Sequence, residues 1–438
     1  MKRRMFSLFG LLALLLPLLA ACGGPAAPKP TEAVPVETPQ AKAEPTEAET
    51  PEAETPEGKP PKAKPTVEPT PTEPALGTPL KTPALEFGVV AHLYYTDHER
   101  VLQLAQNAGF DWMRQQVSWK DTEGPEAGNY IWDQLDIIVN AANTYKRKLL
   151  ISIVDSPSFY TTVADAKGKN GLPKDPKSLG NFVAAMAKRY GNKIQAYEIW
   201  NEQNLAHETG GHITKDSVGQ YVEILVEAYK RIKAVNPRAF VLAGAPSSTG
   251  VTDPVIALSD LEYYKAMYSY KEGIVKDYFD AQAVHPGGSA NPPDTYVDGN
   301  PSTANGWTED STFYFRHVEK VREVMREYNL EDHQVWITEY GWATENVTPG
   351  YEFGNQVTLE QQADYIARAM QRTYEKYPWI GNMFLWNLNF AVLWGQQEPP
   401  QPKHEQASFA ILNADWSPRP SYLKAQSKIA EIKAKEKR

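Results

Sequence analysis

The chain has 438 residues, a formal net charge of −9 and a single cysteine. The negative charge, with no basic cluster beyond residues 2–4, argues against a nucleic-acid-binding protein. Because there is only one cysteine, an intrachain disulfide is excluded.

Residues 1–21 are predicted to be an export signal. Basic residues at positions 2–4 precede an apolar run from Phe6 to Leu19, which is too short for a stable membrane-spanning helix. The run leads into Leu-Ala-Ala-Cys, which resembles the lipobox of bacterial lipoproteins. That resemblance implies that Cys22 becomes the lipidated first residue of the mature chain. We therefore expect an exported protein, anchored through this lipid on the extracytoplasmic side of the bacterial cell membrane.

Residues 22–84 have the composition of a disordered tether. They contain 16 of the 35 prolines and no aromatic residue, so they cannot bury enough apolar surface to offset the entropy lost on ordering. Segments rich in Pro, Glu and Thr are extended and partly polyproline II. The tether is predicted to hold the following domain away from the membrane.

The remaining residues, 85–438, repeat one pattern, in which an amphipathic stretch follows a short apolar run. The runs are almost continuously apolar, as buried parallel strands are, and several of the amphipathic stretches stop at Gly or before Pro, as helices do. Eight such units predict an α/β fold, a (β/α)₈ TIM barrel, with an open doubly wound sheet as the alternative. The eight apolar runs are 86–95, 110–119, 148–155, 194–202, 239–246, 278–285, 334–342 and 381–389.

Two of the predicted strands end in carboxylates. The sequence "WNEQN" places Asn201 and Glu202 after the fourth run, and "WITEYGW" places Glu339 at the end of the seventh. The carboxyl ends of barrel strands form the catalytic face, where strands four and seven can face each other across the mouth. Hydrolysis of a glycosidic bond uses two carboxyl groups, one protonated and one ionised. The pair therefore predicts a glycosidase.

These motifs resemble those of the clan A glycoside hydrolases over residues 86–425, with families 5 and 39 most similar in the short motifs. The resemblance implies that Glu202 is the general acid/base and Glu339 the nucleophile. It also implies that Asn201 contacts the sugar 2-hydroxyl. The expected reaction is hydrolysis of a β-linked poly- or oligosaccharide by double displacement, with retention of configuration.

Three further residues match positions of the clan pattern. Arg114 matches an arginine beneath the nucleophile, where its charge would keep Glu339 ionised. His285 matches a histidine of strand six, but Gly287 stands where many clan members have a tyrosine. This departure leaves open which group donates to the nucleophile. Trp386 matches the tryptophan that forms the floor of the sugar site.

Three more side chains are expected near the site because of their positions in the chain. His92 follows the first strand, and Tyr340 follows Glu339 directly; neither has an assigned role. Trp342 is a candidate for stacking on a sugar ring.

No metal or cofactor is expected. The stretch "HETGGH", 207–212, looks like a zinc-protease motif, but its histidines are five residues apart rather than four, and two glycines interrupt any helix. We expect a monomer whose partner is a carbohydrate. A non-catalytic carbohydrate-binding lipoprotein, serving transport or adhesion, is the alternative function. The sequence leaves open which linkage is cleaved and whether cleavage is internal or terminal.

Overall fold

The computed structural model describes residues 79–164 and 169–436. The predicted export signal, the lipidation site at Cys22 and nearly all of the predicted tether lie outside the described residues. None of the helices in the described part is long and apolar enough to cross a membrane.

Eight parallel strands pair in chain order and close into a barrel, because the last strand, β8 (Ile380–Leu385), pairs with the first, β1 (Glu86–Val90). Each strand overlaps one of the eight predicted apolar runs, so the prediction of a (β/α)₈ barrel is confirmed and the open doubly wound sheet is excluded. The strands are β1 (Glu86–Val90), β2 (Trp112–Ser118), β3 (Lys148–Val154), β4 (Ala196–Ile199), β5 (Phe240–Ala243), β6 (Ala281–Val284), β7 (Gln334–Tyr340) and β8 (Ile380–Leu385).

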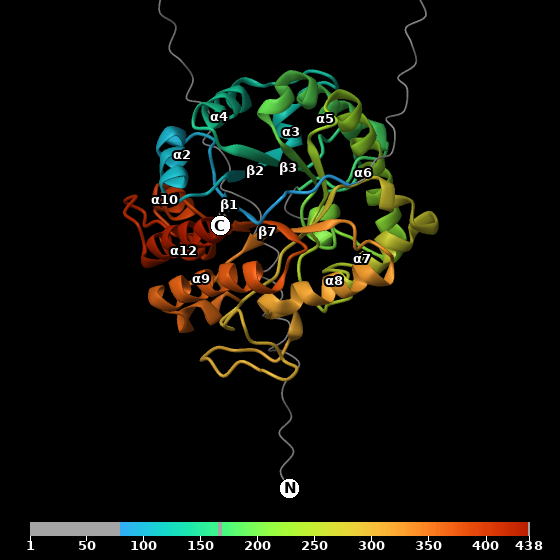
Figure 1. Ribbon diagram of the computed structural model, residues 1–438. Coiled ribbons are helices and arrows are strands. Elements are labelled where there is room, and N and C mark those ends of the chain that lie inside the picture. The colour runs from blue at the N-terminus through green and yellow to red at the C-terminus, as the bar shows by residue number, and fades with distance from the viewer. Residues whose placement is uncertain (1–78, 165–168, 437–438) are drawn as a thin grey trace, which may run out of the picture. The chain divides into compact units, whose positions relative to one another are not determined.

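Helices surround the strands as a ring (Figure 1). Local signals set where they begin. The Asp175 side chain accepts from the backbone at the start of α5 (Pro176–Tyr190), and Thr358 and Gln361 form a capping box at the start of α9 (Leu359–Lys376). Short helices α3 (Trp119–Thr122), α10 (Phe390–Gly395) and α11 (Glu405–Phe409) lie in the loops. The helices of the ring are α2 (His98–Asn107), α4 (Asp133–Thr144), α5 (Pro176–Tyr190), α6 (Lys215–Val235), α7 (Asp260–Ser269), α8 (Val318–Glu327), α9 (Leu359–Lys376) and α12 (Pro420–Glu436).

Two large apolar clusters fill most of the interior of the domain. The outer core lies between the strands and the helices, and the inner core fills the barrel, as alternation of side chains along each strand requires. Near the carboxyl ends of β3, β4 and β7, the barrel interior also contains the buried polar side chains of Ser152, Glu198 and Thr338. The inner core's buried members on the strands are Val90, Trp112, Leu150, Ala196, Leu242, Ala281, Ala283, Trp336 and Phe384, and the half-buried Phe240 packs against them.

The barrel domain includes a few residues that precede its predicted start at position 85. Leu80 N donates to Asp280 Oδ1 at 3.1 Å, and Thr82 N donates to Gln334 Oε1 at 2.9 Å. These bonds connect residues 80–82 to the start of β6 and β7, so this part of the predicted tether is a structured part of the domain.

Candidate active site

A β-bulge in β7 determines where Glu339 lies. Along a regular strand, side chains alternate between the two faces, and here Trp336 belongs to the inner core and Ile337 to the outer core. The pairing of β7 with β8 then shifts register between Ile337 and Tyr340. As a result, Thr338 and Glu339 both bond to side chains inside the barrel, and Tyr340 returns to the outer core. A regular strand would have aimed Glu339 at the helices.

Asn201 and Glu202 follow β4 through an irregular turn. Trp200 and Glu202 have positive φ angles of 70° and 49°, which non-glycine residues adopt mainly where surrounding contacts enforce them, often at functional sites. Such contacts are present, because Trp200 Nε1 donates to Glu208 O at 2.9 Å and Glu202 N donates to Ala245 O at 2.8 Å. The turn therefore holds the two polar residues at the mouth of the barrel.

Arg114, on β2, joins the two strand ends. Its Nη1 donates to Glu339 Oε1 and its Nη2 to Asn201 Oδ1, each at 2.7 Å. Its Nε donates to Glu198 Oε2, also at 2.7 Å. The arginine is buried, so these charge-assisted bonds are protected from screening by solvent. One guanidinium thus fixes the orientation of Glu339 and of the amide beside Glu202.

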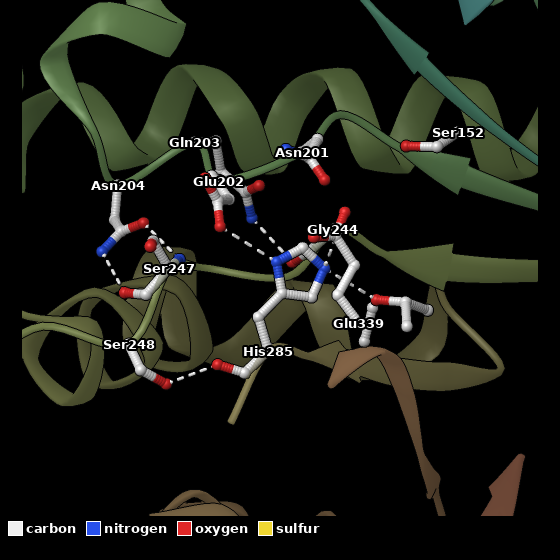
Figure 2. Close-up of polar contacts among 12 residues, drawn as sticks. Ser152, Asn201, Glu202, Gln203, Asn204, Gly244, Ser247, Ser248, His285 and Glu339 are labelled. Carbon is white, nitrogen blue, oxygen red and sulfur yellow. Dashed lines mark hydrogen bonds and ion pairs between the residues drawn. The ribbon is translucent and has the colours of Figure 1, made fainter. Parts of the chain in front are cut away.

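His285, directly after β6, lies between the two candidate catalytic carboxylates (Figure 2). Its Nδ1 is 3.1 Å from Glu202 Oε1, and its Nε2 is 3.8 Å from Glu339 Oε1 and 3.1 Å from Thr338 Oγ1. Since Thr338 donates its own proton to Glu198 Oε1 at 2.9 Å, it must accept from His285 Nε2–H. The contact between His285 Nδ1 and Glu202 then contains a single proton, held by one partner or the other.

Burial and the neighbouring charges act in opposite directions on this group. Burial raises the pKa of Glu339; the charges of His285 and Arg114 lower it, but the net shift is upward, with Glu202 adding to the rise. Burial lowers the pKa of His285, yet the charges of Glu339 and Glu202 outweigh it, and that pKa is raised. Arg114 therefore limits the rise in the pKa of Glu339, as its predicted role requires, but does not cancel the effect of burial.

Glu202, His285, Glu339 and Trp386 line one cavity at the mouth of the barrel. Glycines and aromatic rings make up much of the remaining wall, which suits the C–H faces of a sugar ring. Gly287 is part of the wall at the position where many clan members have a tyrosine, and Arg114 donates to Glu339 here. The rest of the wall is Ser247, Ser248, Pro286, Gly288, Ser289, Phe313, Tyr340, Gly341, Gly350, Tyr351, Phe353, Glu405, Gln406 and Phe409.

The other predicted residues near the site lie at its edge or behind it. Tyr340 contributes to the wall, but its hydroxyl is buried without a hydrogen-bond partner in the described part of the chain. Trp342 is buried behind the wall, where a Cβ at Gly288 would come within 2.5 Å of its Nε1, so it supports a loop rather than stacking on a sugar. His92 is outside the lining and packs edge-on against Phe390; burial lowers the pKa of His92 to about 4.

Sequence reasoning missed Glu198, Thr338 and Glu405. Glu198 had a visible signal, because a charged residue two positions after Ala196 in an apolar strand faces the barrel interior. Thr338 depends on the bulge, and Glu405 comes from a long loop whose course no periodicity predicts.

A family model described as "Cellulase (glycosyl hydrolase family 5)" matches residues 77–382. No protein with a curated description matches the chain. A family 39 glycoside hydrolase from Bacteroides cellulosilyticus is a similar solved structure, with 19% identity and a TM-score of 0.56 over 80% of this chain and 64% of that one. The chain thus spans less than two thirds of that protein.

Two other solved structures have the same TM-score of 0.56. GH5_18 from Streptomyces cattleya, in complex with GlcNAc, is 14% identical over 80% of this chain and 81% of that one. A glucosidase from Croceicoccus marinus is 12% identical over 82% of this chain and 69% of that one. At these identities the structures show a common fold, and the family model carries the assignment. The chain therefore belongs to glycosyl hydrolase family 5, in clan A of the glycoside hydrolases, and is a glycosidase.

Proposed function

We propose that this glycosidase cleaves a β-linked poly- or oligosaccharide by double displacement, with Glu202 as general acid/base and Glu339 as nucleophile. The observation that carries the proposal is the position of the two carboxylates. Glu202 follows β4 and Glu339 lies near the end of β7; the two line one cavity and approach opposite nitrogens of the His285 ring. Most glycoside hydrolases use two carboxyl groups that flank the scissile bond, one as general acid and the other as nucleophile or base.

In the first step, Glu202 protonates the glycosidic oxygen while Glu339 Oε attacks the anomeric carbon. The bond to the leaving group breaks and a covalent glycosyl-enzyme forms. Arg114 orients Glu339 for this attack. Asn201 Nδ2, buried and without a partner in the described residues, is available to donate to a sugar hydroxyl beside the nucleophile.

In the second step, Glu202 removes a proton from water, which attacks the anomeric carbon and releases Glu339. The change of role follows from the charges. Once Glu339 is an ester, its negative charge is gone, so the main charge that raises the pKa of His285 is lost. Glu202 gave its proton to the leaving group in the first step, and the lost charge of Glu339 no longer favours a proton on the His285–Glu202 pair, so Glu202 can act as a base.

The stereochemical course of hydrolysis tests this proposal. We expect activity on 4-nitrophenyl β-glycosides and none on the matching α-glycosides, which serve as the control. The first product seen by proton NMR should be the β-anomer, because two inversions restore the configuration. A first product in the α configuration would contradict the double displacement. The family description makes β-glucans the first polymers to assay, followed by xylan, mannan and exopolysaccharides, with products sized to distinguish internal from terminal cleavage.

We also propose that the enzyme is exported and held on the cell membrane by lipid on Cys22, as the lipobox-like run supports. Cys22→Ser should leave the protein in the soluble fraction or block its maturation, because one or more acyl chains supply the membrane affinity. Gly23→Ala keeps the cysteine and is the control. Fractionation after a high-salt wash is the measurement, and a Cys22→Ser protein that stays with the membrane would rule out lipid anchoring.

A further inference from the structure

A third buried carboxylate lines the cavity that contains Glu202 and Glu339. Glu405 begins α11, in the long loop between β8 and α12, and is 1% exposed. Double displacement uses two carboxylates and gives this one no part. Because buried carboxylates are rare unless something pairs with them, the surroundings of Glu405 indicate its purpose.

Only one oxygen of Glu405 is bonded within the described part of the chain. Its Oε2 accepts from Thr348 Oγ1 at 2.9 Å and lies 2.8 Å from His404 Nδ1. The Thr348 hydroxyl also accepts from Glu405 N at 3.0 Å. The second oxygen, Oε1, is buried and has no hydrogen-bond partner among the described residues. A buried acceptor of this kind is costly until a donor reaches it, and a ligand in the cavity can supply that donor.

The two loops that carry these residues are joined to each other. Val347 N donates to Lys403 O at 3.0 Å, and Thr344 Oγ1 donates to Ser408 O at 2.9 Å. Lys403 and Ser408 lie on both sides of Glu405 in the sequence, so these bonds hold the Glu405 carboxylate in place before any ligand arrives. A preorganised polar group of this kind gives specificity without a cost of ordering.

The charges of the cavity define which sugars it suits. Among the described residues, its lining holds three carboxylates and neither lysine nor arginine, and His285 is its one basic side chain. A carboxylate accepts hydrogen bonds from hydroxyl groups and repels another carboxylate. The aromatic rings of Trp386 and Phe409 offer apolar faces to the ring of the same sugar. A sugar unit with free hydroxyls and no acid group fits this lining.

Building on the proposed glycosidase function, we infer that Glu405 is a specificity-determining residue. It accepts a hydrogen bond from a hydroxyl of a neutral sugar unit in the cavity, and its charge discriminates against uronic acids.

The test compares Glu405→Ala and Glu405→Gln with Glu345→Gln. Glu345 is a matched control, because it lies on one of the same two loops, is 72% exposed and does not line the cavity. The substrates are 4-nitrophenyl β-glucoside and β-galactoside with the corresponding uronides. Glu405→Ala should lower kcat/KM on the better neutral substrate roughly 10- to 100-fold, as loss of a hydrogen bond to a charged group does. Glu405→Gln, which keeps the shape, should raise the uronide-to-neutral ratio of kcat/KM about tenfold or more.

Two results separate this inference from the proposed function. If the wild type hydrolyses the neutral glycosides but Glu405→Gln gives the same substrate ratio as Glu345→Gln, the inference is overturned and the proposed function stands. If the wild type hydrolyses none of them, calorimetry with cello-, manno- and xylotetraose decides. An affinity that falls tenfold or more in Glu405→Ala supports the inference. An affinity that is unchanged in Glu405→Ala, or no binding by the wild type, overturns it. Thermal melting shows whether each variant folds.

Discussion

Glu339→Gln should give a folded protein that binds oligosaccharide and has lost at least ~10²–10⁴-fold in kcat, the range of general acid–base help alone. The amide has the shape of the carboxylate and can still accept from Arg114, so the fold should survive. It cannot form the glycosyl ester, so the first chemical step fails. Steady-state kinetics measure the loss of kcat, and thermal melting shows whether the variant folds.

 The control is Glu345→Gln, because that carboxylate is exposed and lies outside the cavity; its kcat should equal that of the wild type.

A slow 2-fluoro glycoside gives an independent readout of the same residue. In the wild type it should trap the glycosyl-enzyme, and mass spectrometry of the digested protein should place the label on the peptide that contains Glu339. A label on another carboxylate would remove Glu339 from the role of nucleophile.

The pH profile of the wild type should show the same group. Glu339 must be ionised to attack, so activity is lost as pH falls through its pKa. Because burial raises that pKa in the free enzyme, the acidic limb of kcat/KM should lie above the usual range of a glutamate. An acidic limb at the pKa of an exposed glutamate would contradict the assignment.

Glu202→Ala should produce a loss that depends on the leaving group. Natural glycosides need a proton on the departing oxygen, so their hydrolysis should fall by ~10²–10⁴-fold. Activated aryl glycosides leave without that proton, so formation of the glycosyl-enzyme should be affected far less. The alanine also leaves space beside His285, where azide can enter and attack the glycosyl-enzyme in place of water.

Kinetics with both substrate types, with and without azide, measure this effect. Azide should partly restore turnover of the aryl glycoside and yield a β-glycosyl azide. Equal losses on both substrate types, with no effect of azide, would rule out Glu202 as the acid/base.

The sequence predicted the barrel because buried parallel strands are almost continuously apolar and several of its helices end at Gly or before Pro. Glu202 and Glu339 could be found for a related reason: a carboxylate directly after an apolar strand must lie at the barrel mouth. Both the apolar strands and the two carboxylates can be recognised from short stretches of sequence, each no longer than one strand and the residues directly after it.

What the sequence could not predict depends on contacts between distant strands. Arg114 and Glu198 are 84 residues apart, and only the closed barrel brings their side chains together. Trp342 and Trp386 look alike in the sequence, each near the end of a strand, yet one supports a loop and the other lines the cavity. The side of the strand that each occupies is set by register and by the bulge in β7, which leave no trace in composition.

The irregular pairing of β7 also limits how this catalytic site can be transferred to another scaffold. An engineer who grafts the carboxylates onto an idealised barrel would copy the residue types and straighten the strand, since regular strands are easier to design. In a straightened β7, Thr338 and Glu339 would point to opposite sides, and the carboxylate would face the helices. The graft must therefore include the backbone irregularity together with the two side chains that it aims inward.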